Sequence, residues 1–204
     1  HICFYSKKYL KTFQELKSIL KQRNQALKTF QKTAPWDKML IESSEKIWKE
    51  KEGYKDKINI EMKKIQKEFK TPPTAIEIKG VLKDPKEIEQ KLIEARDIEY
   101  KKGHTTIGPH KDTVQYFLKE EEIKTTASQG EKSLFFSILK KAEAQTIKSQ
   151  SEKEPIILLD DIFSKLDKKN VHTILNLFQK NAQTIITHTD QIQKERVNMV
   201  NIND

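Results

Sequence analysis

The chain has 204 residues, of which 35% are hydrophobic, and its 39 Lys and Arg side chains against 30 Asp and Glu give a net charge of +9. This composition excludes a membrane span and a small disulfide-stapled scaffold, because the chain has no long apolar run and only one cysteine. The length allows one domain or two small ones, and no stretch looks like a secretion signal, so we expect a cytoplasmic protein.

The positive charge is concentrated near the N-terminus. Residues 1–34 carry eight basic side chains and one acidic one, a net charge of +7, whereas the rest of the chain is nearly neutral. Clustered lysines suit a nucleic-acid backbone, because each neutralised phosphate releases counterions. A solvated helix face explains the same lysines equally well.

Two long helices are predicted in the first 70 residues. Apolar side chains recur at intervals of three and four over residues 9–33 and again over residues 47–69. Pro35 separates the two stripes, and Thr71-Pro72-Pro73 ends the second. We expect an antiparallel helix pair in which the aromatic and methionine side chains pack between the helices rather than bind a ligand. The stripes are Leu10, Phe13, Leu16, Leu20, Leu27 and Phe30, and then Ile47, Tyr54, Ile58, Met62, Ile65 and Phe69.

Shorter elements are predicted in the middle of the chain. Residues 75–79 alternate like a strand, and Asp84-Pro85 then begins a helix as its cap and first-turn proline. Two further strands are expected at 105–107 and 113–118, on either side of a turn. The buried side of the helix is expected at Ile88, Leu92 and Ala95.

The C-terminal half alternates between helix and strand. This order predicts a parallel α/β layer. The strand at 156–159 consists of four consecutive apolar residues, so we expect it to be buried on both faces. The expected elements are a helix over 131–147, a strand over 156–159, a helix over 168–178 and a strand over 184–186.

Two acids, Asp160 and Asp161, follow the first of these strands directly. Ligands of parallel sheets bind at the carboxyl ends of the strands, so both acids are candidates for a binding site. Adjacent carboxylates need a cation or strong donors, and Mg²⁺ bound to nucleotide phosphates is one such partner. A plain strand end followed by a helix cap is the alternative interpretation.

Two other segments carry polar groups suited to phosphate. Ser128-Gln129-Gly130 precedes the helix at 131–147, where free N–H groups and the helix dipole attract an anion. His188 follows the strand at 184–186 and is placed to contact a phosphate at the same sheet edge. Taken singly, the first segment also fits an ordinary capped helix start, and His188 also fits a surface histidine.

Together, in this order, these motifs resemble the C-terminal half of an ATP-binding-cassette (ABC) type ATPase head. Ser128-Gln129-Gly130 resembles the signature motif, Asp160-Asp161 the Walker B pair, Ser164-Lys165-Leu166-Asp167 the D-loop, and His188 the switch histidine. Within that superfamily the chain is similar to the RecF family of bacterial recombination proteins. The similar segments are residues 20–24, 103–112, 127–131 and 158–167.

The resemblance implies an α/β fold: the C-terminal half of an ABC-type head, with a partly parallel sheet and helices, plus a helical arm. We expect residues 1–100 to form a DNA-contacting arm and residues 101–204 the ATPase lobe. ATP and Mg²⁺ are the implied cofactors. The expected roles are catalysis for Asp161 and His188, metal binding for Asp160, nucleotide binding for Ser128, Gln129, Gly130 and Asp167, and DNA contact for Lys17, Lys21, Arg23 and Lys28.

The same resemblance implies a function in recombinational repair and replication. It implies an ATP-dependent homodimer on gapped DNA, at single-strand to double-strand junctions, that helps to load RecA together with RecO and RecR. Asp161 stands where transporters and chromosome-maintenance ATPases have Glu and where RecF-type proteins have Asp, and this shorter acid favours slow turnover. The sequence departs from the RecF pattern at His188, where many such chains have a small or hydroxyl residue, and at Lys111, where the family has Arg.

The phosphate-binding motif G-x-x-x-x-G-K-[ST] does not occur in this sequence. We therefore expect a chain that begins after the N-terminal lobe and does not hydrolyse ATP alone. Two alternatives stay open. One is a structural or interaction module that has lost nucleotide chemistry, and the other is a fragment of another chromosome-maintenance type ATPase, which would tend to have Glu at position 161 or a longer coiled coil.

Overall fold

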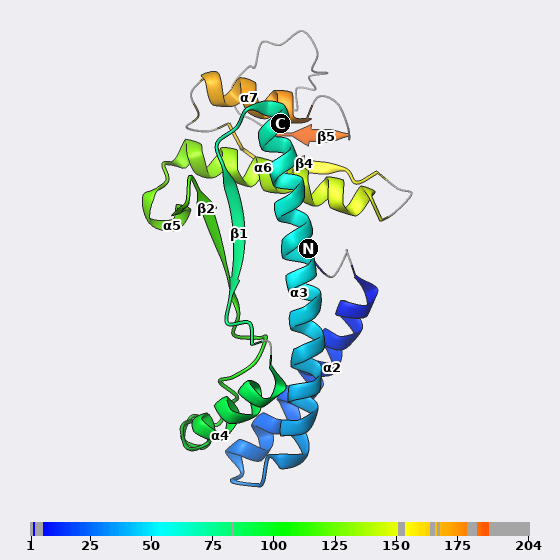
Figure 1. The fold of residues 1–204 in the computed structure, drawn as a ribbon, viewed down its shortest axis with the longest axis vertical. Coiled ribbons are helices and arrows are strands. Elements are labelled where there is room, and N and C mark those ends of the chain that lie inside the picture. Colours follow the sequence, from blue (N-terminus) through cyan, green and yellow to red (C-terminus); the bar gives the residue numbers. More distant parts are fainter. Residues whose placement is uncertain are drawn as a thin grey trace, which may run out of the picture.

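The computed structural model describes residues 2, 6–82, 84–150, 154–163, 166, 168–178 and 183–187. One long helix, α3 (Ala34–Phe69), runs along the molecule and organises it (Figure 1). Helices α2 (Lys7–Lys28) and α4 (Pro85–Lys102) lie against its first half, and the other described elements gather around its second half.

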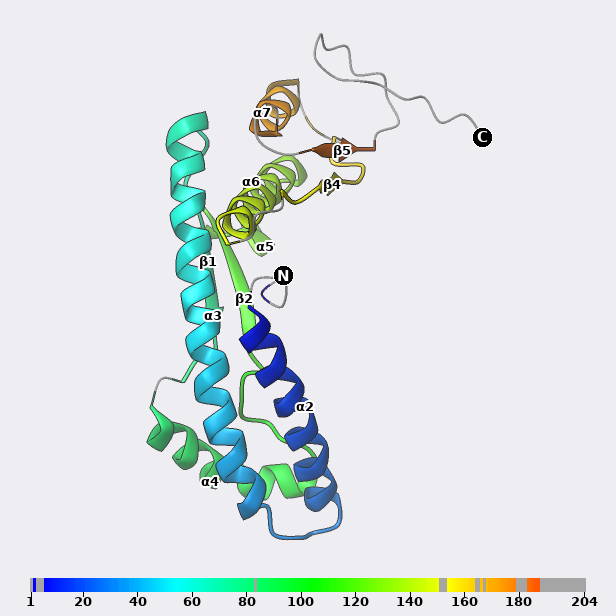
Figure 2. The same ribbon diagram turned by 90° about the vertical axis from the view of Figure 1, so that its right-hand side faces the viewer.

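The helix pair predicted from the apolar stripes is confirmed. Ser6 caps α2 by accepting a hydrogen bond from the Tyr9 N–H, and Pro35 occupies the first turn of α3. The two helices run antiparallel, joined by a short turn at the tip of the arm (Figure 2). The first helix ends at Lys28, earlier than its apolar stripe suggests, so Phe30 lies outside it.

A small antiparallel sheet runs beside α3. Strand β1 (Thr74–Lys79) pairs with β2 (Thr113–Leu118) from Thr74 opposite Leu118 to Lys79 opposite Thr113. A two-residue turn with positive φ at Lys119 and Glu120 then leads into β3 (Glu121–Glu122), as in hairpins of type I′. The predicted strands at 75–79 and 113–118 are therefore confirmed.

The strand predicted at 105–107 is wrong. These residues have no strand partner, because side chains take the backbone donors that a sheet would use. The Thr105 N–H donates to Asn24 Oδ1 at 2.8 Å, and the Thr106 N–H donates to Glu99 Oε1. The preceding helix α4 does begin as predicted, with the Asp84 side chain accepting from the Lys86 N–H.

A short helix that was not predicted, α5 (Ile123–Thr126), comes first. The elements after it follow the predicted order: α6 (Gln129–Lys148), β4 (Ile157–Leu159), α7 (Lys168–Phe178) and β5 (Thr184–Ile186). Strands β4 and β5 are parallel, with Ile157 opposite Thr184 and Leu159 opposite Ile186. The mixed helix and sheet fold with a partly parallel sheet is thus confirmed.

Burial on both faces of the strand at 156–159 is wrong. Ile157 and Leu159 are buried in the core that includes α6 and α7, whereas Ile156 and Leu158 are 59% and 70% exposed. The described residues cover only one face of this strand, so burial alternates along it with the two-residue period of a half-covered sheet.

The side chains form two hydrophobic cores that share α3. One joins α2, the first half of α3 and α4, and the other joins the second half of α3 to β1, β2 and α5 through α7. Because α3 belongs to both cores, the hydrophobic packing shows no domain boundary at residue 100. The division into an arm and an ATPase lobe therefore stays a prediction. No helix in the described part of the chain is both long and apolar enough to cross a bilayer.

Candidate functional site

The two acids at the end of β4 lie beside the end of β5. Thr187, directly after β5, continues the parallel ladder by donating its N–H to the Leu159 carbonyl at 3.0 Å. Its hydroxyl donates to Asp160 Oδ1 and accepts the Asp161 N–H at 3.1 Å. One threonine hydroxyl thus links both acids and fixes the direction of the Asp160 carboxylate.

Asp161 has a positive φ of 45°, in the left-handed region that non-glycine residues seldom adopt. The chain turns there as it leaves the strand, and the Asp161 backbone N–H is held by the Thr187 hydroxyl. Both are solvent-exposed. Backbone strain of this kind clusters at functional sites, and here it coincides with two acids that one hydroxyl holds, which makes the end of β4 a candidate site.

These oxygen groups fit a magnesium ion that is bound mainly by phosphate and water. Mg²⁺ takes hard oxygen ligands and usually keeps several waters, with one or two protein carboxylates. The described residues contain no cluster of three or more His, Cys, Asp or Glu able to hold a metal alone. An exposed Asp160 beside a threonine hydroxyl therefore suits a metal brought by a nucleotide.

Ser128 caps the 20-residue helix α6 in a reciprocal arrangement with Glu131. The Glu131 N–H donates to Ser128 Oγ at 3.2 Å, and the Ser128 N–H donates to Glu131 Oε2 at 3.0 Å. The N–H groups of Gln129 and Gly130 have no acceptor within the helix, as in any first turn. They and the dipole make this end attractive to an anion.

The Ser128 backbone N–H, then the Lys119 ammonium and the Ser128 hydroxyl, lower the pKa of Glu131 below its ordinary value. Lys119 Nζ lies 3.2 Å from Glu131 Oε1. Glu131 is therefore ionised at neutral pH and partly neutralises the helix end. The same capping hydrogen bonds are also those expected if the segment is an ordinary helix start, which was the alternative interpretation.

Gly130 brings the start of α6 against the D-loop-like segment. A Cβ at position 130 would lie 3.3 Å from Leu166 Cδ2 and 3.5 Å from Asn170 Nδ2, at the start of α7. The absence of a side chain thus allows the signature-like segment and the D-loop-like segment to touch. Asp167 and His188, predicted for nucleotide binding and catalysis, lie outside the described residues.

The predicted DNA-contacting residues separate into two groups. Lys17, Lys21 and Lys28 are exposed on one face of α2, because at about 100° per residue they fall within about 40° of each other. Arg23 lies about 120° away from Lys17, on the buried face, and is 1% exposed. The prediction that Arg23 contacts DNA is therefore wrong.

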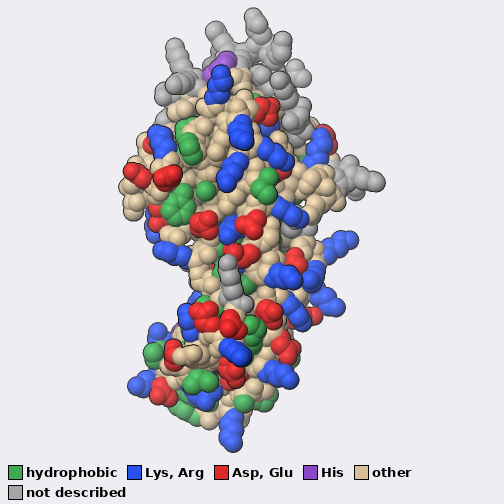
Figure 3. All heavy atoms as spheres, in the orientation of Figure 1, with side chains coloured by type: hydrophobic (Ala, Val, Ile, Leu, Met, Phe, Trp, Pro, Cys, Tyr) green, Lys and Arg blue, Asp and Glu red, His purple; other side chains and the backbone are tan. Residues whose placement is uncertain are grey.

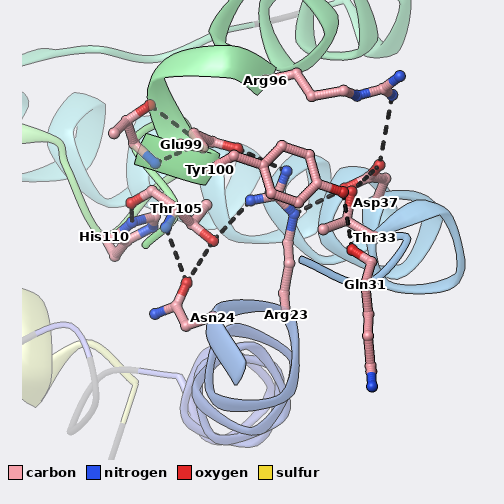
Figure 4. A network of polar contacts seen from close by, with 11 residues as sticks. Arg23, Asn24, Gln31, Thr33, Asp37, Arg96, Glu99, Tyr100, Thr105 and His110 are labelled. Carbon is pink, nitrogen blue, oxygen red and sulfur yellow. Dashed lines mark hydrogen bonds and ion pairs between the residues drawn. The ribbon is translucent and has the colours of Figure 1, made fainter. Parts of the chain in front are cut away.

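Arg23 instead holds the arm together (Figure 4). Its Nη2 lies 2.7 Å from Glu99 Oε2 on α4, its Nε donates to Asp37 Oδ1 on α3 at 2.7 Å, and its Nη1 donates to Thr105 at 2.8 Å. Asn24 accepts two hydrogen bonds from Thr105, and His110 Nε2 contacts the Thr105 carbonyl at 3.2 Å. Burial lowers the pKa of His110, which favours its neutral ring.

The similarity to the family at residues 20–24 and 103–112 thus marks one buried network. Sequence reasoning missed Asn24 and Thr187 as positioning residues. Thr187 could have been found, because it directly follows a predicted parallel strand and strand ends of such a sheet meet. The residues around Asn24 do not indicate that it positions another segment, because its partner Thr105 is 81 residues away along the chain.

Known proteins resemble this arrangement. A chain with a small parallel sheet that ends in paired acids, a signature-like helix start against a D-loop-like segment and a long helical arm has the fold of the C-terminal half of an ABC-type ATPase head. Two solved structures of the recombination mediator protein RecF, titled RecF-ATP and RecF-ATPrS in the RecFOR pathway, match with TM-scores of 0.76 and 0.75. They cover 95% and 92% of this chain, 55% and 54% of their own, at 22% and 23% identity.

The sequence matches point to the same proteins. The DNA replication and repair protein RecF of Acetivibrio thermocellus is 32% identical over 93% of this chain and 56% of its own length. That of Ligilactobacillus salivarius is 32% identical over 88% of this chain and 52% of its own. No family model matches. Over most of its length the chain is similar to RecF proteins, and it spans about half the length of the curated relatives it matches.

Proposed function

We propose that this chain is the arm and C-terminal lobe of a DNA-binding ATPase of recombinational repair and replication. The observation that carries the proposal is the Thr187 hydroxyl bound to both Asp160 and Asp161 at a parallel sheet edge, in a chain similar to RecF over nearly its whole length. The proposed protein acts as an ATP-dependent dimer on gapped DNA and assists RecA together with RecO and RecR.

The residues of this chain have separate tasks in that proposal. Bound ATP with Mg²⁺ would supply a phosphoanhydride bond, and hydrolysis of that bond would set when the two subunits of the dimer separate. Asp160, held by Thr187, is the carboxylate on the metal side. Asp161 orients the attacking water, and its short side chain favours slow turnover. Ser128 and the first N–H groups of α6 face phosphate oxygens across the dimer.

The exposed lysines of α2 provide the DNA contact in this proposal. Lys17, Lys21 and Lys28 lie exposed on one face of α2, whereas Arg23 on the buried face is paired with Asp37 and Glu99. Contacts of this kind fix the position of DNA and carry no sequence information.

The decisive experiment uses a RecF-length protein that carries this segment. Ser128→Arg should abolish ATP-dependent dimers in sedimentation and leave ATP binding by monomers intact, whereas Thr125→Arg, an exposed control on α5, should change neither. Asp161→Asn should slow hydrolysis and allow ATP-held dimers, and Asp160→Ala should weaken Mg-nucleotide binding. Normal dimers in Ser128→Arg or unchanged hydrolysis in Asp161→Asn would refute the assigned roles.

A further inference from the structure

The tip of the arm exposes an aromatic ring that the sequence pattern assigns to the interior. Phe30 continues the apolar stripe of the first helix, yet its side chain is 78% exposed. The reason is that α2 ends two residues earlier. The Gln31 N–H donates to the Ala26 carbonyl at 2.8 Å and the Phe30 N–H to the Leu27 carbonyl at 3.3 Å, the hydrogen bonds of a Schellman motif.

In this motif Phe30 occupies the left-handed position, with φ of 54°. Glycine is usual there, because a side chain is strained in that conformation. A large aromatic residue at this position that is 78% exposed adds nothing to the buried core of the arm. Strain of this kind calls for a functional explanation.

The ring is held in a fixed direction. Phe30 stacks on Tyr100 of α4 with ring centroids 6.1 Å apart and planes 7° from parallel. The Tyr100 hydroxyl in turn donates to the Gln31 carbonyl at 2.8 Å (Figure 4). The Phe30 ring is therefore an exposed flat surface supported from one side, in a turn tied to α4 at two points.

Four lysines are close to this ring in the sequence: Lys28 and Lys32 lie two residues on either side of Phe30, and Lys101 and Lys102 follow its stacking partner Tyr100. Lys28 lies against the end of α4, because a Cβ at Gly103 would be 3.1 Å from Lys28 Cγ. Lys32, Lys101 and Lys102 are also exposed in the same two segments, and α4 exposes Glu94 and Asp97 as well. Hydrophobic, basic and acidic side chains are mixed on the face of this end of the molecule that Figure 3 shows.

We propose that Phe30 is a stacking platform for an unpaired base of single-stranded DNA, with the neighbouring lysines on its phosphates. This inference rests on the proposed DNA-binding function and adds a specific residue and a strand preference to it. An aromatic ring within a basic surface binds single strands because every base offers a flat face, whereas base pairs inside a duplex keep their faces stacked on each other.

The test compares variants that separate stacking from structure. Phe30→Gly removes the ring and places the preferred residue in the left-handed position, so its melting temperature should be equal to or above that of the unchanged chain. Its affinity for fluorescein-labelled oligo(dT) should fall about fivefold to tenfold, and its affinity for a duplex should stay the same. Phe30→Trp should restore single-strand binding. Ile93→Ala, which removes another exposed apolar side chain from the arm, should change neither affinity.

Anisotropy over a salt series distinguishes the possible failures. Loss of stacking should lower the affinity at every salt concentration without changing the slope of log affinity against log salt. Equal loss of single-strand and duplex binding in Phe30→Gly, or no loss in a chain that binds DNA, would overturn the stacking proposal and leave DNA binding intact. Failure of the unchanged chain to bind either DNA would instead refute the proposed DNA-binding function and with it this inference.

Discussion

Replacing Arg23 by Met should destabilise the arm severely, because it leaves Glu99 buried without its cation. Glu99 is 0% exposed, and within the described part of the chain its partners besides Arg23 are the N–H and hydroxyl of Thr106. Asp37 is less affected, since Thr33 Oγ1 still donates to its Oδ2 at 3.0 Å. Breaking one side of a buried ion pair costs about 3–5 kcal/mol.

For a chain of this size that loss corresponds to a fall in Tm of roughly 6–20 °C. The free energy of unfolding would be measured from urea curves followed by circular dichroism. Lys21→Met is the matched control, since it makes the same change on the exposed face of the same helix, and its effect should stay within about 0.5 kcal/mol.

A double variant tests the reasoning itself. Arg23→Met with Glu99→Gln removes both charges, so it should be more stable than Arg23→Met alone by about 1 kcal/mol or more. If Arg23→Met were as mild as Lys21→Met, or flattened the salt dependence of DNA binding without loss of stability, Arg23 would be a surface contact and the assignment of a structural role would fail.

Three further predictions concern the lysine face and the start of α6. Replacing Lys17, Lys21 and Lys28 with Gln should flatten the slope of log affinity for duplex DNA against log salt by up to roughly 0.9 per lost contact, and an unaltered slope in anisotropy titrations would leave these lysines as a solvated face. Gly130→Val should destabilise the lobe by about 1–3 kcal/mol in urea unfolding, because its side chain meets Leu166 and Asn170, and a neutral effect would contradict the close contact. Because the pKa of Glu131 is lowered from 4.5, its ionised form stabilises the fold above that pH and the contribution disappears as the pH falls through the folded value. Glu131→Gln should therefore lower Tm near pH 7 and change it little at about pH 3, whereas a difference independent of pH would count against the capping carboxylate.

Local sequence signals determined most of the secondary structure. The helix over 168–178 and the strand over 184–186 lie where the apolar pattern predicts them, and the cap at Asp84 lies where the proline after it predicts. The reason is that caps, prolines and hydrophobic periods act over a few neighbouring residues, so they can be recognised in the sequence alone. The same locality explains why Asp160 and Asp161 were recognised at a strand end.

The tertiary structure alone decided which side chains face the interior. Arg23 has the local pattern of a surface cation, and it is buried because α3 and α4 place Asp37 and Glu99 around it. Residues 105–107 do not form the predicted strand because Asn24 and Glu99 bind their backbone N–H groups. Phe30 is exposed although it belongs to the apolar stripe, because α2 ends before it and Phe30 takes a left-handed conformation. Leu158 is exposed because the described elements cover only one face of β4. Each outcome depends on residues that are distant in the sequence and close in the fold. The local sequence around a hydrophobic or charged residue is the same whether or not such a partner lies beside it, so the sequence alone does not show its burial.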